Sequence, residues 1–288
     1  MCGKIRREKR IRRDGGLPMP KKIVLLLLTL VLTALCANAL GDAEEHTVYF
    51  PSTQENTATP LAVTTDFDWF DGDAAEYNHG LARMSIAMAV AAFRDVTVEL
   101  TDSDHYLRTF FDELGFEGYR ALGYDQTPSG TTISNAFAYK RLEDEDGPYV
   151  LLAVPVCGQG YGDEWLSNFA VYDGTEHAGF AFSADLVLTR LQAYVAQELP
   201  GERIKVWITG FSRAAAVSNL LGYRLLSKEL FAEDSVFVYT FGTPNVTTEY
   251  FYYPQINNIV GSFDPVPKIP LKEWGYDKHG RVLVLPSR

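Results

Sequence analysis

The sequence predicts an α/β protein in which helices flank a mainly parallel central sheet. Four largely apolar runs occur in the second half of the chain, and they lack the polar alternation of a half-exposed strand. Such runs are typical of strands buried on both faces of a parallel sheet. Helical segments lie between them, and this strand–helix alternation indicates one α/β domain. The four runs are Tyr149–Val156, Ile204–Thr209, Val236–Phe241 and Ile256–Ser262.

The composition is that of an acidic globular protein. Hydrophobic residues make up 47% and charged residues 22% of the 288 residues, which excludes a disordered or fibrous chain. The formal net charge is −11, and residues 1–39 hold nine of the 26 Lys and Arg but only two of the 37 Asp and Glu. The rest of the chain is therefore more acidic still, with no basic stripe for a phosphate backbone. We expect no nucleic-acid partner.

Residues 1–39 are predicted to be a signal peptide. Lys21 and Lys22 precede an uncharged, largely apolar stretch at residues 23–40, and the small residues at 37–39 match a signal-peptidase site. Met19 is the expected true start, because the segment before it is long and basic for the beginning of a signal peptide. The alternative is an uncleaved membrane anchor at residues 23–40, which are long enough to span a bilayer. Both versions place the body outside the cytoplasmic membrane, secreted or extracytoplasmic.

Residues 40–60 are rich in Thr, Glu and Ala and are predicted to be a flexible linker, so that the folded domain covers residues 61–288. Near its start, Asn78 is placed to cap a helix that continues to Phe93. A second helix has its apolar residues on one face and ends at Gly115.

The remaining elements follow in order between the apolar runs. Residues 133–139 are predicted to form a strand that leads into an acidic turn. Helices are expected over residues 180–199 and 213–226, and a last strand over residues 282–285. We find no internal repeat, and the scattered histidines indicate no metal site.

The most informative motif is Gly210-Phe211-Ser212-Arg213-Ala214, which lies where a predicted strand meets a predicted helix. A tight strand-to-helix turn of this kind, a nucleophile elbow, projects a serine hydroxyl above the sheet. Small residues are needed two positions on either side of the serine, because the strand and helix backbones pass close together. The alternative is a serine that caps the helix after a glycine turn.

A nucleophilic serine needs a carboxylate and a histidine, which in this fold follow it in the order Ser, Asp, His. Asp264 lies in the loop after the run Ile256–Ser262, at the carboxyl end of a strand, where the sites of open α/β sheets collect. The alternative is a structural role, in which the side chain of Asp264 accepts a hydrogen bond from the backbone in a turn before Pro265.

Five segments together resemble the class 3 (fungal-type) lipase family of α/β hydrolases, in the family's order. The resemblance extends from about Tyr149 to the end of the chain. The first and second segments are similar to the family's oxyanion-loop and His-x-Gly-Phe motifs, and the third is the elbow. The segments are 156–165, Glu176–Phe180, the elbow around Ser212, Phe241–Pro244 and Asn258–Pro270.

The resemblance implies an α/β-hydrolase fold with Ser212 as the nucleophile and Asp264 as the acid of the triad. It further implies that the backbone N–H groups of Gln159 and Arg213 form the oxyanion hole. The loop Gly160–Phe169 corresponds to the lid, with Trp165 in it; the alternative for Trp165 is an ordinary core aromatic residue. The chain departs from the family at Cys157 and Gln159, where the family has Arg and Ser or Thr.

The histidine of the triad is open at this point. His279 follows Asp264 in the right order, and an antiparallel strand at 282–285 would bring it to the active-site side of the sheet. It aligns, however, with a family segment whose histidine is not catalytic. The alternative, which we favour, is that the catalytic histidine lies beyond Arg288.

The sequence thus predicts a secreted serine hydrolase that cleaves carboxylic esters, with acyl lipids as the implied substrates. Ser212, Asp264 and His279 are the candidate triad, and no cofactor or metal is expected. Contact with a lipid interface is an expected property of this class, and the oligomeric state is open. The alternative function is a catalytically inactive hydrolase-fold surface module that binds lipid or a partner.

Overall fold

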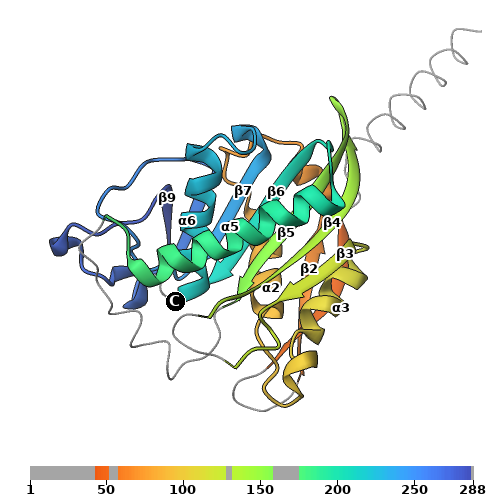
Figure 1. Ribbon diagram of the computed structural model, residues 1–288, viewed down its shortest axis with the longest axis horizontal. Helices are drawn as coiled ribbons and strands as arrows, with labels where there is room; N and C mark the ends of the chain where they lie inside the picture. The colour runs from red at the N-terminus through yellow and green to blue at the C-terminus, as the bar shows by residue number, and fades with distance from the viewer. Residues whose placement is uncertain (1–42, 52–57, 128–131, 158–174, 287–288) are drawn as a thin grey trace, which may run out of the picture. The chain divides into compact units, whose positions relative to one another are not determined.

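A seven-stranded sheet forms the centre of the computed structural model, which describes residues 43–51, 58–127, 132–157 and 175–286. The strand order is β3-β4-β5-β6-β7-β8-β9 (Figure 1). The pairs from β5 to β9 are parallel, whereas β3, β4 and β5 pair antiparallel. The strands are β3 (Glu117–Leu122), β4 (Ser134–Asp144), β5 (Gly147–Cys157), β6 (Ile204–Phe211), β7 (Val236–Phe241), β8 (Ile256–Gly261) and β9 (Arg281–Leu285).

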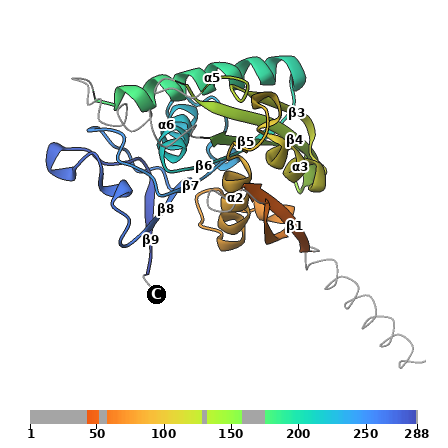
Figure 2. The same cartoon turned by 90° about the horizontal axis from the view of Figure 1, so that it is seen from below.

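Helices and a small hairpin cover the two faces of this sheet (Figure 2). The α-helices are α2 (His79–Ala91), α3 (His105–Glu113), α5 (Ala178–Glu198) and α6 (Arg213–Ser227), and short 3₁₀ turns are η1 (Phe67–Phe70), η2 (Leu100–Asp102), η3 (Glu233–Ser235), η4 (Val266–Lys268) and η5 (Lys272–Trp274). Helices α5 and α6 pack on one face, and α2 and α3 belong to the core on the other. Along β5, Leu151 and Ala153 join one core and Val150, Leu152 and Val154 the other, as the two-residue period of a strand requires.

The predicted α/β class and its main elements are confirmed. All six residues of β7 are buried, and seven of the eight residues of β6 are buried, in agreement with strands covered on both faces. The side chain of Asn78 accepts a hydrogen bond from the N–H of Leu81 and so caps α2. Helix α3 stops before Gly115, whose φ of +67° favours glycine.

The flexible linker predicted over residues 40–60 is wrong in its described part. Strands β1 (Glu44–Pro51) and β2 (Ala58–Thr65) pair antiparallel in a separate two-stranded sheet. Val48 and Val63 are each 3% exposed and belong to the hydrophobic core. The polar residues that suggested a linker occupy the exposed face of the hairpin, because alternate residues of a strand face opposite sides. The folded unit therefore begins at Ala43.

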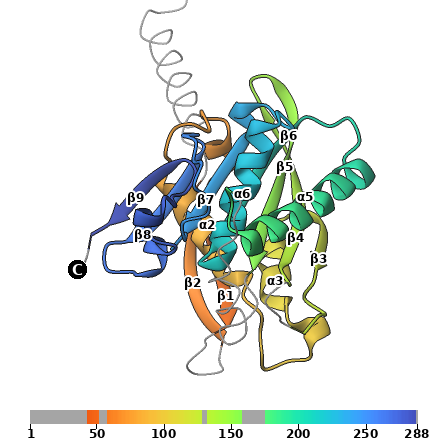
Figure 3. The same ribbon diagram turned by 60° about the vertical axis from the view of Figure 1, so that its left-hand side comes forward.

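Strand β9 is parallel to β8, so an antiparallel last strand is also ruled out. Asn257 of β8 pairs with Arg281 of β9, and the register continues to the end of both strands. The two strands form one edge of the sheet (Figure 3). Parallel strands all begin at the same end of a sheet. The start of β9, and the residues just before it, therefore lie at the end of the sheet opposite to the carboxyl ends of the strands.

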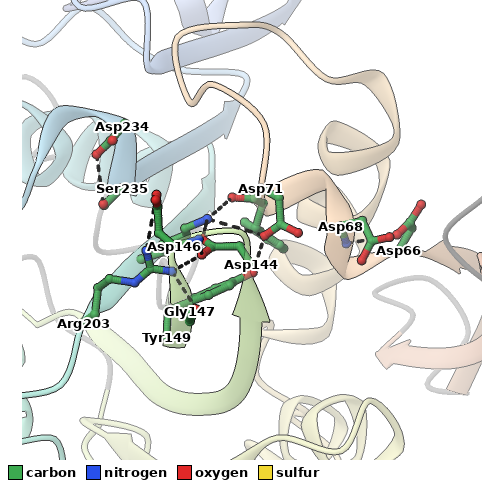
Figure 4. Close-up of polar contacts among 12 residues, drawn as sticks. Asp66, Asp68, Asp71, Asp144, Asp146, Gly147, Tyr149, Arg203, Asp234 and Ser235 are labelled. Carbon is green, nitrogen blue, oxygen red and sulfur yellow. Dashed lines mark hydrogen bonds and ion pairs between the residues drawn. The ribbon is translucent and has the colours of Figure 1, made fainter. Parts of the chain in front are cut away.

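An ion-pair cluster ties the amino-terminal edge of the sheet together (Figure 4). The buried Lys205 donates to the carbonyl oxygen of Phe70 at 2.7 Å and pairs with Asp144 at 2.7 Å. Tyr149 donates to Asp71 at 3.1 Å, and Arg203 also pairs with Asp144. Hydrogen bonds from Lys205 and Arg203 hold the pKa of Asp144 well below its usual range. The cluster joins η1 to the β4–β5 hairpin and the start of β6, so its role is structural.

Two predicted segments lie outside the described residues: the signal peptide at residues 1–39 and the membrane anchor proposed as its alternative at 23–40. In the part of the chain that is described, no helix has the length and apolar character needed to cross a membrane. Cys157 is buried and forms no disulfide.

Candidate active site

Ser212 occupies the sharp turn between β6 and α6. Its φ of +56° and ψ of −121° form a backbone conformation that a residue other than glycine rarely adopts. This is the strained turn that defines a nucleophile elbow. The side chain makes no capping hydrogen bond to α6 and is partly exposed, so the helix-cap alternative is wrong.

The elbow depends on close contact between the strand and the helix. A Cβ atom on Gly210 would lie 2.5 Å from the carbonyl oxygen of Ala214 and 2.7 Å from Oγ of Ser218. That oxygen of Ser218 donates to the carbonyl of Thr209, so the helix is bonded directly to the strand before the turn. The small residues that the motif shows at 210 and 214 are therefore required by the backbone geometry.

Replacing Gly210 by valine should destabilise the elbow. The added atoms have no space next to the backbone of Ala214, and overpacking of this kind lowers the free energy of unfolding by about 1–3 kcal/mol. Chemical denaturation of the variant measures the loss. Gly72→Ala is the control, because a Cβ there would meet only the carbonyl oxygen of Trp69 at 3.8 Å. Equal stability of the two variants would contradict the close packing.

Asp264 lies beside the elbow, in the loop that follows β8. A Cβ on Gly242 would lie 3.4 Å from Oδ2 of Asp264 and 4.0 Å from the backbone nitrogen of Ser212, so these atoms are close neighbours across one glycine. The other oxygen, Oδ1, accepts a hydrogen bond from the N–H of Val266 at 2.9 Å. The aspartate therefore forms the local turn with one oxygen and presents the second toward the elbow.

Two polar side chains hold the loops on either side of Asp264. Asn245 follows β7 and donates to the carbonyl oxygen of Pro270 at 2.7 Å. Lys278 is 4% exposed and donates to Oδ1 of Asn245 at 2.7 Å and to the carbonyl oxygen of Pro267 at 2.9 Å. Burial lowers the pKa of Lys278 to about 8. Sequence reasoning missed both residues, since a lysine between turns is usually a surface residue.

Of the two residues predicted to form an oxyanion hole, only Arg213 lies among the described residues. Arg213 is the first residue of α6, where backbone N–H groups have no acceptor inside the helix. The positive end of the helix dipole also favours negative charge at this position. The side chain of Arg213 is buried and donates to the carbonyl oxygen of Thr132 at 3.0 Å. Gln159, Trp165 and the predicted lid Gly160–Phe169 lie outside the described residues.

The structure does not bring His279 to the hydroxyl of Ser212. His279 precedes the parallel strand β9 and so lies toward the amino-terminal edge of the sheet. The strand register places Ser212 beside Val260, near the end of β8, and His279 beside Gln255, the residue before β8. These two positions are five residues apart along the strand, which is roughly 16 Å at ~3.3 Å per residue. The ring is fully buried and stacks on Tyr223 with 3.9 Å between centroids. Nδ1 accepts a hydrogen bond from the N–H of Phe251 at 3.1 Å.

The other four histidines are also bonded elsewhere. His46 pairs with Glu44, and Nδ1 of His79 is hydrogen-bonded to Tyr77. His105 pairs with Asp95 at 3.6 Å. The ring of His177, which precedes α5, stacks on Phe180 with 4.1 Å between the ring centroids. Within the described ranges, the hydroxyl of Ser212 therefore has no histidine partner.

The buried position of His279 predicts a pH-dependent stability. Desolvation, with a smaller contribution from Arg224, lowers the pKa of His279 to about 4. Above pH 6.5 the ring is neutral in both states. Between pH 6.5 and 4 only the unfolded chain binds the proton, so acidification over this window should lower the free energy of unfolding by about 3 kcal/mol.

Denaturation of wild type and His279→Phe across pH 4–7 measures this contribution of His279. The phenylalanine keeps the stacking partner of Tyr223 but binds no proton. The free energy of unfolding should fall less steeply with decreasing pH in the variant, because its residue 279 cannot take up a proton on unfolding. Identical slopes in the two proteins would show that the buried ring does not titrate as described.

The described side chains contain no group of three or more His, Cys, Asp or Glu that could hold a metal ion. The chemistry that the site offers is that of a serine on an elbow, with a carboxylate beside it. Together with the parallel sheet, the strand–elbow–helix arrangement defines the class of the protein as an α/β hydrolase.

Comparison with known proteins shows similarity to lipases within this class. Residues 159–274 match the profile of the family described as lipase (class 3). The chain is similar to the lipase from Rhizopus microsporus var. chinensis, with 19% identity, a TM-score of 0.51, and coverage of 83% of this chain and 82% of that one. It is also similar to a mutant form of MDLA from Penicillium cyclopium, with 20% identity, a TM-score of 0.40 and coverage of 76% and 78%.

A fungal lipase–inhibitor complex is a further similar structure, with 20% identity, a TM-score of 0.35, and coverage of 56% of this chain and 62% of that one. No curated protein matches the sequence significantly. Part of the chain, residues 159–274, therefore matches the class 3 lipase model, and the similarity to the Rhizopus lipase shows the same fold. The family resemblance expected from the sequence segments is thereby confirmed.

Proposed function

We propose that this protein hydrolyses carboxylic esters of acyl lipids, with Ser212 as the nucleophile and Asp264 as the acid of the triad. The observation that carries the proposal is the strained elbow at Ser212 with a carboxylate oxygen of Asp264 next to it across Gly242. In this arrangement the serine oxygen attacks the ester carbonyl as a histidine removes its proton. Asp264 stabilises the imidazolium, which gives its proton to the alcohol as the ester C–O bond breaks and the alcohol leaves. Water, deprotonated by the same histidine, then attacks the acyl-enzyme, and the acid is released as Ser212 regains its proton.

The negative oxygen that forms during attack needs hydrogen-bond donors that are already oriented. We assign this role to the backbone N–H groups of Arg213 and Gln159. Support for Arg213 is its place in the first turn of α6, directly after the nucleophile. Gln159 is assigned from the family resemblance alone.

The general base is a histidine other than His279 in this proposal. His279 is fully buried near the opposite edge of the sheet, and its Nδ1 is already hydrogen-bonded to Phe251. His279→Ala tests this assignment, because the variant should keep the ester turnover of wild type. Loss of turnover in a folded His279→Ala variant would make His279 the base.

Labelling by a fluorophosphonate, together with turnover of short p-nitrophenyl esters, tests the function. Labelled peptide should map to Ser212, and the full-length protein should turn over the esters. The absence of both reactions in the full-length protein would overturn the proposal.

An inactive lipid- or partner-binding module is the second candidate, and the lack of a histidine at Ser212 within the described residues favours it. Imidazole added in solution separates the two. If only the base is missing from the 288-residue chain, free imidazole should accelerate the labelling of Ser212 by the fluorophosphonate. An inactive module should remain unlabelled at every imidazole concentration.

We further propose that the protein is secreted through a signal peptide and works at a lipid surface. Expression from Met19 in a bacterial host should give a protein outside the cytoplasm that begins at Leu40, whereas a retained segment 23–40 would indicate a membrane anchor. Exposed apolar side chains between β8 and β9 support the lipid contact: Phe263 is 81% exposed and Trp274 60% exposed.

A further inference from the structure

Lys278 is a buried lysine without an ion pair among the described residues. Its two hydrogen-bond acceptors, Oδ1 of Asn245 and the carbonyl oxygen of Pro267, are both neutral. The adjacent carboxylate, Asp277, pairs with Lys272 at 2.7 Å. A buried ammonium group without a counter-ion is unfavourable, which is why lysine is rarely found in this environment. A purely structural contact at this place would be made more favourably by an uncharged donor.

The two acceptors belong to the two loops that surround Asp264. Pro267 lies three residues after Asp264 and is buried in η4. Asn245 lies three residues after Gly242, the glycine that separates Asp264 from the elbow. Lys278 itself comes from the segment before β9, so its side chain joins three parts of the chain at one point.

Asn245 strengthens the same connection through its other polar groups. Its backbone N–H donates to the carbonyl oxygen of Ile269 at 2.9 Å, and its side-chain amide donates to that of Pro270 at 2.7 Å. The loop after β8 is therefore bonded at 267, 269 and 270 to Lys278 and Asn245. Its first part is a local turn, in which Asp264 donates its N–H to the carbonyl oxygen of Gly261 and accepts from the N–H of Val266, one residue before Pro267.

We propose that Lys278 is a positioning residue for the catalytic reaction: through Asn245 and Pro267 it holds the loop that directs Asp264 toward Ser212. The inference rests on the proposed function, since it gives the loop a catalytic purpose. A triad carboxylate must orient the base to within a fraction of an ångström, and a misplacement of about 1 Å lowers the rate by roughly 100-fold. Without Lys278, the carbonyl of Pro267 and the amide oxygen of Asn245 lose their donor, and the loop is free to shift.

Lys278→Met tests the proposal, with Lys205→Met as the matched control. Both lysines are buried and donate to a backbone carbonyl, but Lys205 lies in the ion-pair cluster at the amino-terminal edge of the sheet. In the full-length protein, Lys278→Met should lower kcat for p-nitrophenyl esters by about 100-fold and leave KM within about twofold. Lys205→Met should leave both constants near their wild-type values, whatever its effect on Tm.

Hydrogen exchange gives a second measurement that does not depend on activity. Amides in residues 264–270 should exchange at least about tenfold faster in Lys278→Met than in wild type, whereas those of β6 and β7 should not change. If Lys278→Met fails to fold, Lys278→Gln is the second variant. Its side-chain amide is a shorter, neutral donor for the two acceptors, so it should give intermediate values of kcat and exchange.

The outcomes separate the two proposals. An active wild type in which Lys278→Met retains full kcat, or shows unchanged exchange in residues 264–270, would overturn the role of Lys278 alone. A full-length wild type that neither turns over esters nor labels at Ser212 would overturn the proposed function, and with it the catalytic role of the lysine.

Discussion

Replacing Ser212 by alanine should abolish ester hydrolysis and leave the protein folded. The hydroxyl is the only group in the elbow that can form the acyl-enzyme, and loss of a triad nucleophile lowers kcat by roughly 10⁶. The fold should not suffer, because the serine side chain makes no capping hydrogen bond to α6. Alanine also leaves the neighbours Phe211 and Arg213 unchanged, so the oxyanion donors keep their places.

The measurement pairs kinetics with thermal unfolding. Ser212→Ala should lose turnover of p-nitrophenyl esters and all labelling by the fluorophosphonate, at a Tm close to that of wild type. Ser218→Ala is a suitable control, since Ser218 lies on the same helix and its hydroxyl bonds to the strand rather than to substrate. Retention of more than a tenth of wild-type activity by Ser212→Ala would end the assignment of the nucleophile.

The parallel part of the sheet could be predicted from sequence because its strands are buried on both faces. Burial of this kind leaves continuous apolar runs, and β5, β6, β7 and β8 each coincide with one of them. Strand β1 and the first three residues of β2 lie in the segment that its composition predicts to be a linker, because only occasional residues such as Val48 reach the core. Strand β3 was missed for a related reason: none of its six residues is fully buried.

The site was predictable where local geometry dictates residue type. Gly210 must be small because the backbone of Ala214 leaves no space for a side chain, and that requirement is visible in five consecutive residues. The position of His279 is different, because it depends on the direction of β9, and a short strand shows no direction in its sequence. The contacts of Lys278 with Asn245 and Pro267 join segments far apart in the chain, so they too became visible only in the folded structure.

Replacing Asp264 by asparagine should have the second largest effect on catalysis. Asparagine keeps Oδ1 and therefore the hydrogen bond from the N–H of Val266, so the turn after β8 should survive. It replaces the charged Oδ2, the oxygen that faces Gly242 and the elbow, by a neutral amide. An amide neither stabilises an imidazolium nor selects the tautomer that accepts the serine proton, and kcat should fall by roughly 10⁴.

A matched control separates this loss of charge from any loss of structure. Asp73 makes the same kind of turn, with Oδ1 accepting from the N–H of Ala75 at 2.8 Å, and it is exposed and belongs to no part of the site. In the full-length protein, Asp73→Asn should keep its kcat, and both variants should keep a Tm near that of wild type. If Asp264→Asn retained most of its activity, Asp264 would be only a turn residue. Another carboxylate would then have to orient the base, and the position of Asp264 beside Gly242 would have no catalytic meaning.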